Sequence, residues 1–396
     1  MRIHKVLAQA SVDLIRAVFN DGKVLDHELA KAFKANRKWG KRDRGFIAET
    51  TFEVTRWRRA LAYLAQDDSV EALCTVQWTR MGYAIPDWWD RHEIAFESIA
   101  AREEQLADQP RAIRESVPDW LDRRGVEELG DAWESELTIL NNRTRVYLRV
   151  NTLKATRAEA IAWLAGNGIT AEAVDGLPQA IALNPGKTLP RSLLENGMFE
   201  IQDAGSQMIA PLVDPQPGEY VIDACAGAGG KTLHLAALMQ NQGTLLAMDV
   251  QPSKLRELER RAKRADASAL IETTLIGPTT IKEYKGVADC LLIDAPCSGL
   301  GTLRRQPDLK WRLTEEKIEH LHSIQTELLN SYPTMLKPDG RLVYATCSLL
   351  PSENQMQLER FLERGDFKLL EEEMILPSVL GYDGFYAAVL RKYANE

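Results

Sequence analysis

The stretch "YVIDACAGAGGKT" spans residues 220–232 and joins a short apolar run to a glycine-rich turn. The run at 220–224 predicts a buried strand that ends in Asp223, and the glycines predict a tight turn with exposed backbone N–H groups. A helix is expected to begin near Lys231. A strand, a glycine turn and a helix in this order are typical of the first unit of a nucleotide-binding α/β fold.

The ending Gly-Lys-Thr raises the question of a triphosphate-binding loop. That loop requires a glycine five positions before Gly230, where this chain has Cys225. The dinucleotide fingerprint fails as well, because Thr232 stands where glycine or alanine is needed. The turn is therefore expected to hold a different ligand, or to be a purely structural glycine turn.

Short apolar runs at 220–224, 244–249, 289–294 and 341–346 alternate with helical segments. This alternation predicts a mostly parallel, doubly wound α/β sheet, for which we expect a domain at 201–396. Residues 126–200 predict a linker and a small α+β module, with a strand at 145–151 and a helix at 156–169. Residues 1–125 have helical spacing and predict an all-helical domain.

Polar and thiol side chains follow several of these strands. The expected strands end at or just before Asp223, Asp249, Asp294 and Cys347, and Cys297 lies in the turn after Asp294. Ligands bind at the carboxyl ends of the strands in open α/β sheets, so these residues are expected to gather at one edge. Asp249, about 20 residues beyond the glycines, suits a ribose, and S-adenosylmethionine is the common ligand of this kind.

Composition limits the class of protein. The 396 residues carry a net charge of −8, and no apolar stretch is long enough to span a membrane. Five cysteines without paired metal-ligand spacing predict neither disulfides nor a metal site, and indicate a reducing, cytoplasmic setting. Cys74 and Cys290 are expected to be buried packing residues. We expect a monomer.

The charge is unevenly distributed. Residues 1–60 contain 14 Lys and Arg against 7 Asp and Glu, while residues 61–140 contain 7 against 18. The basic block includes "NRKWGKRDRGFIAETTFEVTRWRR", in which cations alternate with Trp39 and Trp57. Such a mixture suits phosphates and unstacked bases, although a solvated helix surface is the alternative.

Three motifs, in this order, resemble those of the RNA (cytosine-5) methyltransferases of the RsmB/NSun type. They are "DACAGAGGKT", "DAPCSGLGTLRRQPDLKW" and "YATCSLLPSEN", supported by "FEIQDAGSQ", "LRVNTLK" and "DGFYAAVLRK". The resemblance covers about residues 145–395, and the segment "RDRGFIAETTFEVTRWRR" resembles the NusB-like RNA-binding domain of some members. It implies a Rossmann-like fold that methylates carbon 5 of cytosine in RNA with S-adenosylmethionine.

The resemblance also implies roles. Cys347 is the implied nucleophile, Cys297 assists the later elimination, and Asp294 binds the cytosine ring. The implied cofactor-binding residues are Cys225, Ala226, Gly227, Ala228, Gly229, Gly230, Lys231, Asp249, Asp294, Ile276 and Gly277. The RNA contacts expected from charge and position are Arg304, Arg305, Lys310, Arg149, Arg56 and Arg58.

Two departures from the family pattern are visible. Ala228 stands where the family often has proline, and the segment at 275–281 lacks the acid that usually contacts adenine. The expected substrate is a single-stranded or loop cytosine of ribosomal RNA, with transfer RNA as the alternative. An RNA-binding assembly factor with a vestigial methylation site and a nucleotide triphosphatase are the rival classes.

Overall fold

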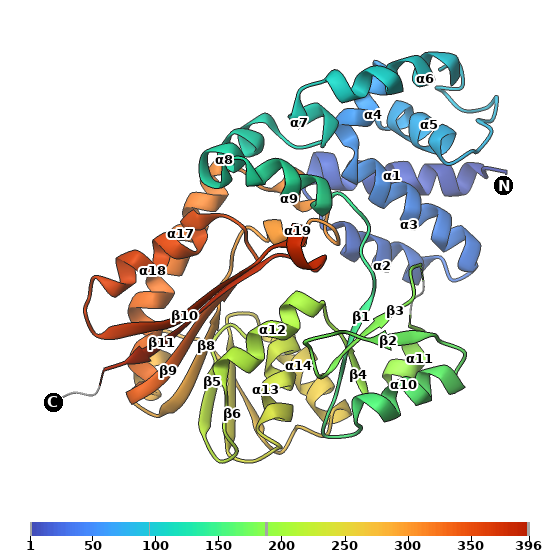
Figure 1. Cartoon of the computed structure of the whole chain (residues 1–396). Coiled ribbons are helices and arrows are strands. Elements are labelled where there is room, and N and C mark those ends of the chain that lie inside the picture. The colour runs from blue at the N-terminus through green and yellow to red at the C-terminus, as the bar shows by residue number, and fades with distance from the viewer. Residues whose placement is uncertain (1, 95, 187–188, 394–396) are drawn as a thin grey trace. The chain divides into compact units, whose positions relative to one another are not determined.

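The computed structural model describes residues 2–94, 96–186 and 189–393. The chain divides into two compact units (Figure 1). The helical unit comprises Met1–Asn142 and Leu303–Lys317, and the sheet unit comprises Arg143–Thr302 and Ile318–Glu396. The chain therefore leaves the sheet unit at Thr302 and returns to it at Ile318.

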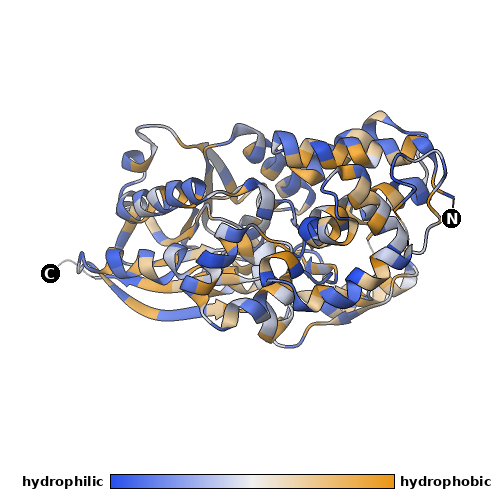
Figure 2. Cartoon of the chain, turned by 90° about the horizontal axis from the view of Figure 1, so that it is seen from above, coloured by the Kyte–Doolittle hydropathy of each residue, from blue (hydrophilic) through white to orange (hydrophobic). Residues whose placement is uncertain are grey.

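The helical unit confirms the helical spacing of the N-terminal sequence. Its helices are α1 (Lys5–Asp21), α2 (Leu25–Ala35), α3 (Lys41–Arg56), α4 (Arg58–Ala65), α5 (Val70–Arg80), α6 (Phe96–Gln105), α7 (Arg111–Arg114), α8 (Asp119–Leu129), α9 (Ala132–Leu140) and α16 (Leu309–Arg312). In α1 the buried residues Leu7, Ser11, Ile15 and Val18 recur every three or four positions. Hydrophobic and hydrophilic residues are interspersed along the helices near the N-terminus (Figure 2). Within the described ranges, no helix has the length and apolar content that crossing a membrane requires.

The first segment of the helical unit extends beyond the expected boundary at residue 125 and includes α9. Trp133 of α9 packs so closely on α8 that a Cβ at Gly125 would lie 2.2 Å from its ring. Leu137 and Leu140 are fully buried. The helical unit therefore runs to Asn142 in its first segment.

The segment Leu303–Lys317 also belongs to the helical unit, although the sequence predicts it within the catalytic domain. Its Lys310 ammonium donates to the carbonyl of Arg56 at 3.0 Å and to Oδ1 of Asn141 at 2.8 Å. The indole N–H of Trp311 donates to the carbonyl of Thr55 at 2.6 Å. These long-range contacts, which no local sequence pattern signals, hold the segment among α3 and the end of α9.

The sheet unit begins with the small α+β module that the sequence predicts. Its strands are β1 (Tyr147–Val150), β2 (Ala171–Ala173), β3 (Ala180–Leu183) and β4 (Phe199–Ile201), and its helices are α10 (Arg157–Gly166) and α11 (Arg191–Leu194). The four strands form an antiparallel sheet in the order β2-β3-β1-β4. Thr156 caps α10 by a reciprocal pair of hydrogen bonds with Glu159.

The main sheet has seven strands in the order β10-β11-β9-β8-β5-β6-β7. The strands are β5 (Tyr220–Asp223), β6 (Thr244–Asp249), β7 (Ile271–Leu275), β8 (Ala288–Asp294), β9 (Leu336–Thr346), β10 (Phe367–Ile375) and β11 (Phe385–Lys392). The pairs among β9, β8, β5, β6 and β7 are parallel, and β10 and β11 are antiparallel. This confirms the mostly parallel, Rossmann-like sheet.

Helices cover both faces of this sheet (Figure 1). They are α12 (Ala204–Val213), α13 (Gly230–Leu238), α14 (Pro252–Arg264), α15 (Thr280–Glu283), α17 (Glu315–Ser331), α18 (Gln355–Leu362) and α19 (Pro377–Leu380). Val221 belongs to the hydrophobic cluster on one face and Ile222 to the cluster on the other. Because successive side chains of a strand alternate, apolar runs without polar interruption are what such a two-sided core requires.

Local side-chain and backbone features mark the start of α17 and an irregularity in β9. The Thr314 hydroxyl accepts a hydrogen bond from the backbone N–H of Lys317 at 3.2 Å, which caps the first turn of α17. Within β9, Asp339 has φ 59° and the pairing with β8 shifts register. The segment at 338–340 therefore forms an irregularity inside the strand.

Gly301 provides a test of the packing near the end of β8. A Cβ at Gly301 would lie 2.1 Å from the carbonyl oxygen of Gly384, so Gly301→Ala should destabilise the sheet unit by about 1–3 kcal/mol. Gly166→Ala, in α10, meets open space and should change stability by less than about 0.5 kcal/mol. Urea unfolding of both variants checks this, and equal stabilities would contradict the close approach.

Candidate active site

Two cysteine thiols meet at the carboxyl edge of the main sheet. Cys297 lies in the loop after β8 and Cys347 directly follows β9, and these two parallel strands pair up to Asp294 and Ala345. The two sulfur atoms are 3.3 Å apart. The backbone N–H of Cys347 also donates to Sγ of Cys297 at 3.3 Å. The structure thus brings together the two cysteines that the sequence singles out.

The surroundings of Cys297 favour its protonated form. The hydrogen bond with Cys347, burial, and the negative charges of Cys347 and Glu353 raise the pKa of Cys297 well above its ordinary value. Cys297 therefore keeps its proton when Cys347 is a thiolate. A thiol that donates to a neighbouring thiolate stabilises that thiolate.

A lysine and a carboxylate lie beside the thiols. Nζ of Lys231 donates to Oδ2 of Asp294 at 2.7 Å, and Lys231 also lies 5.2 Å from the centre of the Phe385 ring. Burial lowers the pKa of Lys231, but attraction to Asp294 and to Cys347 raises it above its ordinary value. Lys231 is therefore a cation that faces both Asp294 and the thiol pair.

A cavity of about 540 Å³ opens next to this group in the sheet unit. This volume is in the range of small-molecule and cofactor sites. Its lining residues are Ala224, Cys225, Asp249, Val250, Gln251, Ile276, Asp294, Pro296, Ile324, Glu327, Leu328 and Tyr332. Four of the residues predicted to bind the cofactor, Cys225, Asp249, Ile276 and Asp294, therefore line one cavity.

The glycine turn has the backbone that its sequence predicts. Gly227 and Gly229 have φ values of 54° and 88°, a region that favours glycine. Oδ2 of Asp249 accepts the N–H of Gly227 at 2.9 Å, and its Oδ1 accepts the N–H of Gln251 at 2.7 Å. Each carboxylate oxygen keeps a further lone pair, which leaves Asp249 able to accept ribose hydroxyls.

Arg149 does not have the position that an RNA contact needs. It is 1% exposed, and its guanidinium donates to the carbonyl of Gly230 and to the side chain of Gln202. Burial lowers the pKa of Arg149 to about 9. On the same turn, Arg261 donates to the carbonyl of Ala228 at 2.6 Å. Arg149 therefore supports the cofactor turn from the small module, which corrects the prediction.

The RNA contacts predicted at Arg56 and Lys310 are also wrong. Arg56 is 3% exposed and donates to the carbonyl of Arg304 at 2.9 Å. Lys310 is fully buried, and burial lowers its pKa well below the ordinary value. Both cations lie inside the helical unit, where no phosphate can reach them.

The remaining predicted cations are partly exposed. The guanidinium of Arg58 lies 4.2 Å from the ring centre of Phe19 and 5.3 Å from that of Trp311. Nε of Arg304 donates to the carbonyl of Asn142 at 3.2 Å, and Arg305 is partly exposed. These three side chains remain candidates for RNA contacts.

Sequence reasoning missed one wall of the cavity. Ile324, Glu327, Leu328 and Tyr332 come from α17 and the turn that follows it. Leu328 and Tyr332 are visible in the sequence as members of an apolar helix face, but that signal indicates packing and not a ligand. Glu327 is notable because it adds a carboxylate to a cavity whose residues at 275–281 include no acid.

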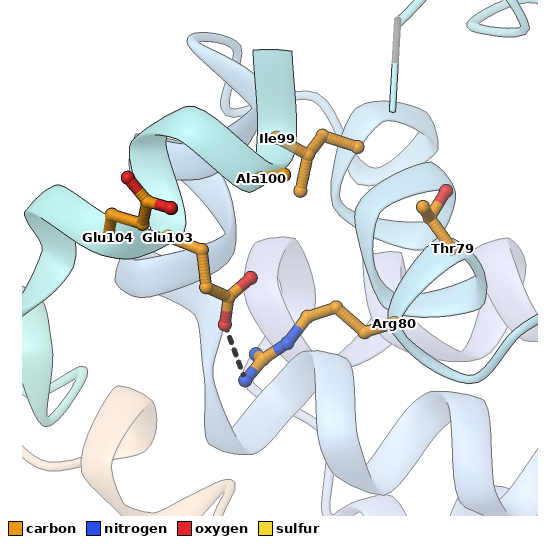
Figure 3. A pocket seen from close by; sticks show the side chains of 6 residues that line it. All are labelled: Thr79, Arg80, Ile99, Ala100, Glu103 and Glu104. Carbon is orange, nitrogen blue, oxygen red and sulfur yellow. Dashed lines mark ion pairs between the residues drawn. The ribbon is translucent and has the colours of Figure 1, made fainter. Parts of the chain in front are cut away.

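The other cysteines and the second large cavity differ from this site. Cys74 and Cys290 are fully buried, which confirms the prediction that they are packing residues. A cavity of about 540 Å³ in the helical unit lies between α5 and α6 (Figure 3). Its charged lining includes an ion pair of 3.1 Å between Arg80 and Glu103. Its lining residues include no thiol, histidine or lysine.

Asp223 gives a pH-dependent test of the site. It is 1% exposed, Thr232 donates to it at 2.7 Å, and burial raises its pKa to about 7. The folded protein therefore keeps on Asp223 a proton that the unfolded chain releases near pH 3.8. The stabilisation that this proton provides is complete below pH 3.8 and is lost as the pH rises to about 7.

We compare the free energy of unfolding of Asp223→Asn with that of the parent. This difference should shift in favour of the variant by about 3 kcal/mol between pH 5 and pH 8. Urea unfolding across this pH range measures the difference. The exposed Asp175→Asn serves as the control and should follow the parent at every pH. Parallel curves for the parent and Asp223→Asn would contradict a buried, protonated Asp223.

Comparison with known proteins places this geometry in a family. The family model described as "16S rRNA methyltransferase RsmB/F" matches residues 210–391, and that of an RsmF/B-like ferredoxin-like domain matches residues 117–188. The crystal structure of PH0851 has the same fold, with a TM-score of 0.80, 24% identity and coverage of 99% of this chain and 100% of that one.

Curated relatives agree. A probable ribosomal RNA small subunit methyltransferase B of Synechocystis is 36% identical over 310 residues, which cover 70% of this chain and 67% of the relative. The ribosomal RNA small subunit methyltransferase B of Pasteurella multocida is 35% identical, with coverage of 70% and 66%. The chain spans about two thirds of the length of these relatives. It belongs to the RsmB/F family of S-adenosylmethionine-dependent, Rossmann-like RNA methyltransferases.

Proposed function

We propose that this protein transfers a methyl group to carbon 5 of a cytosine in RNA through a covalent adduct with Cys347. The observation that carries this proposal is the contact of 3.3 Å between the sulfurs of Cys297 and Cys347, in which Cys297 directly follows Pro296 of the cavity lining. Methylation of an exocyclic nitrogen or a hydroxyl needs no thiol. A pair of thiols is expected where one thiol must bond to the ring to activate a ring carbon and that bond must later be broken.

Carbon 5 of cytosine is too weak a nucleophile to accept a methyl group unaided. A thiolate that adds to carbon 6 moves electrons into the ring and makes carbon 5 reactive. Cys347 suits this role because Lys231 is a nearby cation and the sulfur of Cys297 lies within hydrogen-bonding distance, 3.3 Å from that of Cys347. S-adenosylmethionine supplies an electrophilic methyl group when it is bound, and Asp249 and Cys225 line the cavity that would hold it.

The second thiol accounts for the later step. Once Cys347 is bonded to carbon 6 it carries no charge, so a main cause of the raised pKa of Cys297 disappears and Cys297 can lose its proton to solvent. The Cys297 thiolate then takes the proton from carbon 5, the bond between sulfur and carbon 6 breaks, and Cys347 leaves as a thiolate. The resting protonation of the pair is restored.

Asp294 and Lys231 are suited to bind the base. The carboxylate of Asp294 lines the cavity, and its bond to Lys231 fixes its direction. We assign Asp294 to the N3 and amino edge of cytosine, where hydrogen bonds stabilise the charge that develops when the thiolate adds. Glu327 is a candidate to bind the amino group of adenine, in place of the acid that the segment at 275–281 lacks.

Ribosomal RNA is the substrate that we propose, because the curated relatives carry the name of ribosomal RNA small subunit methyltransferases. The target base must leave its stack to reach both thiols, so a single-stranded or loop cytosine in the cytoplasm fits best. The test is methyl transfer to unmodified transcripts of small-subunit ribosomal RNA and of transfer RNA, followed by nucleoside mass spectrometry. 5-Methylcytidine in the ribosomal transcript supports the proposal, and its absence from both transcripts contradicts it.

Substitution of each cysteine should affect a different step of the reaction. Cys347→Ala should lower methyl transfer by at least about 10³-fold while cofactor affinity measured by calorimetry stays within about twofold, because the variant lacks only the nucleophile. Cys297→Ala should still form the adduct and release it slowly, so a band of protein joined to RNA should accumulate on a denaturing gel.

Cys74→Ala is the matched control, since that thiol is buried in the helical unit and should leave transfer unchanged. Normal turnover by Cys347→Ala would rule out its assignment as nucleophile. Rapid release by Cys297→Ala would move the elimination step to another group.

The exposed cations between the end of α2 and the start of α3 should contribute to RNA binding. Lys34, Arg37, Lys38, Lys41 and Arg42 are exposed, and none of these cations is ion-paired within the part of the chain that the structure describes. The triple change Lys38→Gln, Lys41→Gln and Arg42→Gln should weaken binding of single-stranded RNA. It should reduce the slope of log K against log salt by about 2.

Filter binding at several salt concentrations measures this slope. Three exposed lysines of the sheet unit supply the control, namely Lys282→Gln, Lys285→Gln and Lys368→Gln. An unchanged slope for the α3 triple, or an equal loss in both triples, would show that this surface is only a solvated helix face.

A further inference from the structure

Each catalytic thiol is followed by a serine, and the two serines are in contact. Ser298 follows Cys297 and Ser348 follows Cys347, and their hydroxyl oxygens are 3.1 Å apart. Ser298 is 1% exposed and Ser348 is fully buried. The two thiol loops are therefore joined twice, by the contact between the sulfurs and by the contact between the serine hydroxyls.

A buried carboxylate holds the Cys297 side of this contact. Glu353 is fully buried and accepts the backbone N–H of Ser298 at 2.8 Å and the Ser298 hydroxyl. Gln325 of α17 donates to the same carboxylate at 3.1 Å and to the carbonyl of Pro296 at 2.9 Å. Glu353 and Gln325 together thus hold the loop on both sides of Cys297, at Ser298 and at Pro296.

The next residue holds the Cys347 side. The amide of Asn354 donates to the carbonyl of Ser348 at 3.0 Å, and its oxygen accepts the Thr346 hydroxyl at 2.6 Å. The backbone N–H of Ser348 donates to the same hydroxyl at 3.2 Å. Two adjacent residues of one short turn therefore hold the loops that follow β8 and β9.

The charge of Glu353 is costly for the fold. No Lys or Arg among the described residues forms an ion pair with Glu353, and a buried carboxylate without a counter-ion destabilises a protein unless hydrogen bonds compensate. A neutral glutamine of the same shape has only one acceptor oxygen, so it could not accept both the N–H and the hydroxyl of Ser298 as Glu353 does. Residues that depart from the rule that buried charges are paired are expected at functional sites.

We propose that Glu353 is a positioning residue that sets the separation of the Cys297 and Cys347 thiols and acts on Cys297 through its charge. The proposal rests on the cytosine chemistry proposed above, because it assigns a role within that same site. Glu353 does not line the cofactor cavity, so it should affect the thiol steps and not cofactor binding.

The charge has a consequence for the release step. The groups that face Cys297 are Cys347, Glu353 and Tyr344, and both the thiolate of Cys347 and the carboxylate of Glu353 raise the pKa of Cys297. In the adduct only Glu353 of these two remains charged. Removal of that charge should therefore lower the pKa of Cys297 and allow it to act as a base at lower pH.

The experiment uses the full chain, S-adenosylmethionine and an unmodified transcript of small-subunit ribosomal RNA. Single-turnover formation and release of the covalent adduct are measured between pH 6 and pH 9. For Glu353→Gln we expect cofactor affinity within about twofold, methyl transfer lowered by about 10²-fold, and the pH midpoint of release shifted to lower pH. Glu359→Gln, an exposed change on α18, should behave as the parent.

Ser298→Ala separates geometry from charge and remains informative if Glu353→Gln does not fold. It removes the hydroxyl bonds to Glu353 and Ser348 and keeps the carboxylate, so transfer should slow while the pH midpoint of release stays unchanged. Parental rates in Ser298→Ala or in Glu353→Gln would overturn the positioning role. A slow Glu353→Gln with an unshifted midpoint would overturn the role of its charge.

Failure of the proposed function has a different signature. In that case the parent and Glu359→Gln would themselves form no adduct and no 5-methylcytidine. If both form them and Glu353→Gln does so equally well, only the inference on Glu353 fails.

Discussion

The contact between the Cys297 and Cys347 sulfurs is the constraint on which the arrangement of the site depends. It requires that two loops remote in sequence end side by side, and the parallel pairing of β8 with β9 provides this. The rest of the site serves that contact. Lys231 supplies positive charge, Asp294 lines the cavity and pairs with Lys231, and the turn of Glu353 and Asn354 holds both loops.

Three acids at this edge of the sheet have distinct environments. Asp223 is protonated up to about pH 7, Asp294 is paired with Lys231, and Glu353 accepts only neutral donors among the described residues. Such differences in environment allow neighbouring acids to have different protonation states, and so different roles, at one pH. The same edge is stabilised from the small module, where Arg149 binds the carbonyl of Gly230.

Sequence reasoning recovered what local patterns encode and missed what long-range contacts decide. Apolar runs identified β5, β6, β8 and β9, and strand ends identified Asp249, Asp294 and both thiols. Arg149, Arg56 and Lys310 look like surface cations in a sequence, because nothing local shows that carbonyl groups from distant segments surround them. For the same reason the segment Leu303–Lys317 could not be assigned to the helical unit, and Glu353 stood in a recognised motif without a role.

The most direct test of the central claim is the fate of the hydrogen on carbon 5. RNA transcribed with cytidine that carries tritium at carbon 5 is incubated with the protein and S-adenosylmethionine, and released tritium is compared with methyl groups incorporated. Methylation through a Cys347 adduct with base-assisted elimination predicts one tritium released for each methyl group gained. Methyl incorporation with the tritium retained would place the methyl group on another atom and contradict the assigned roles of both thiols.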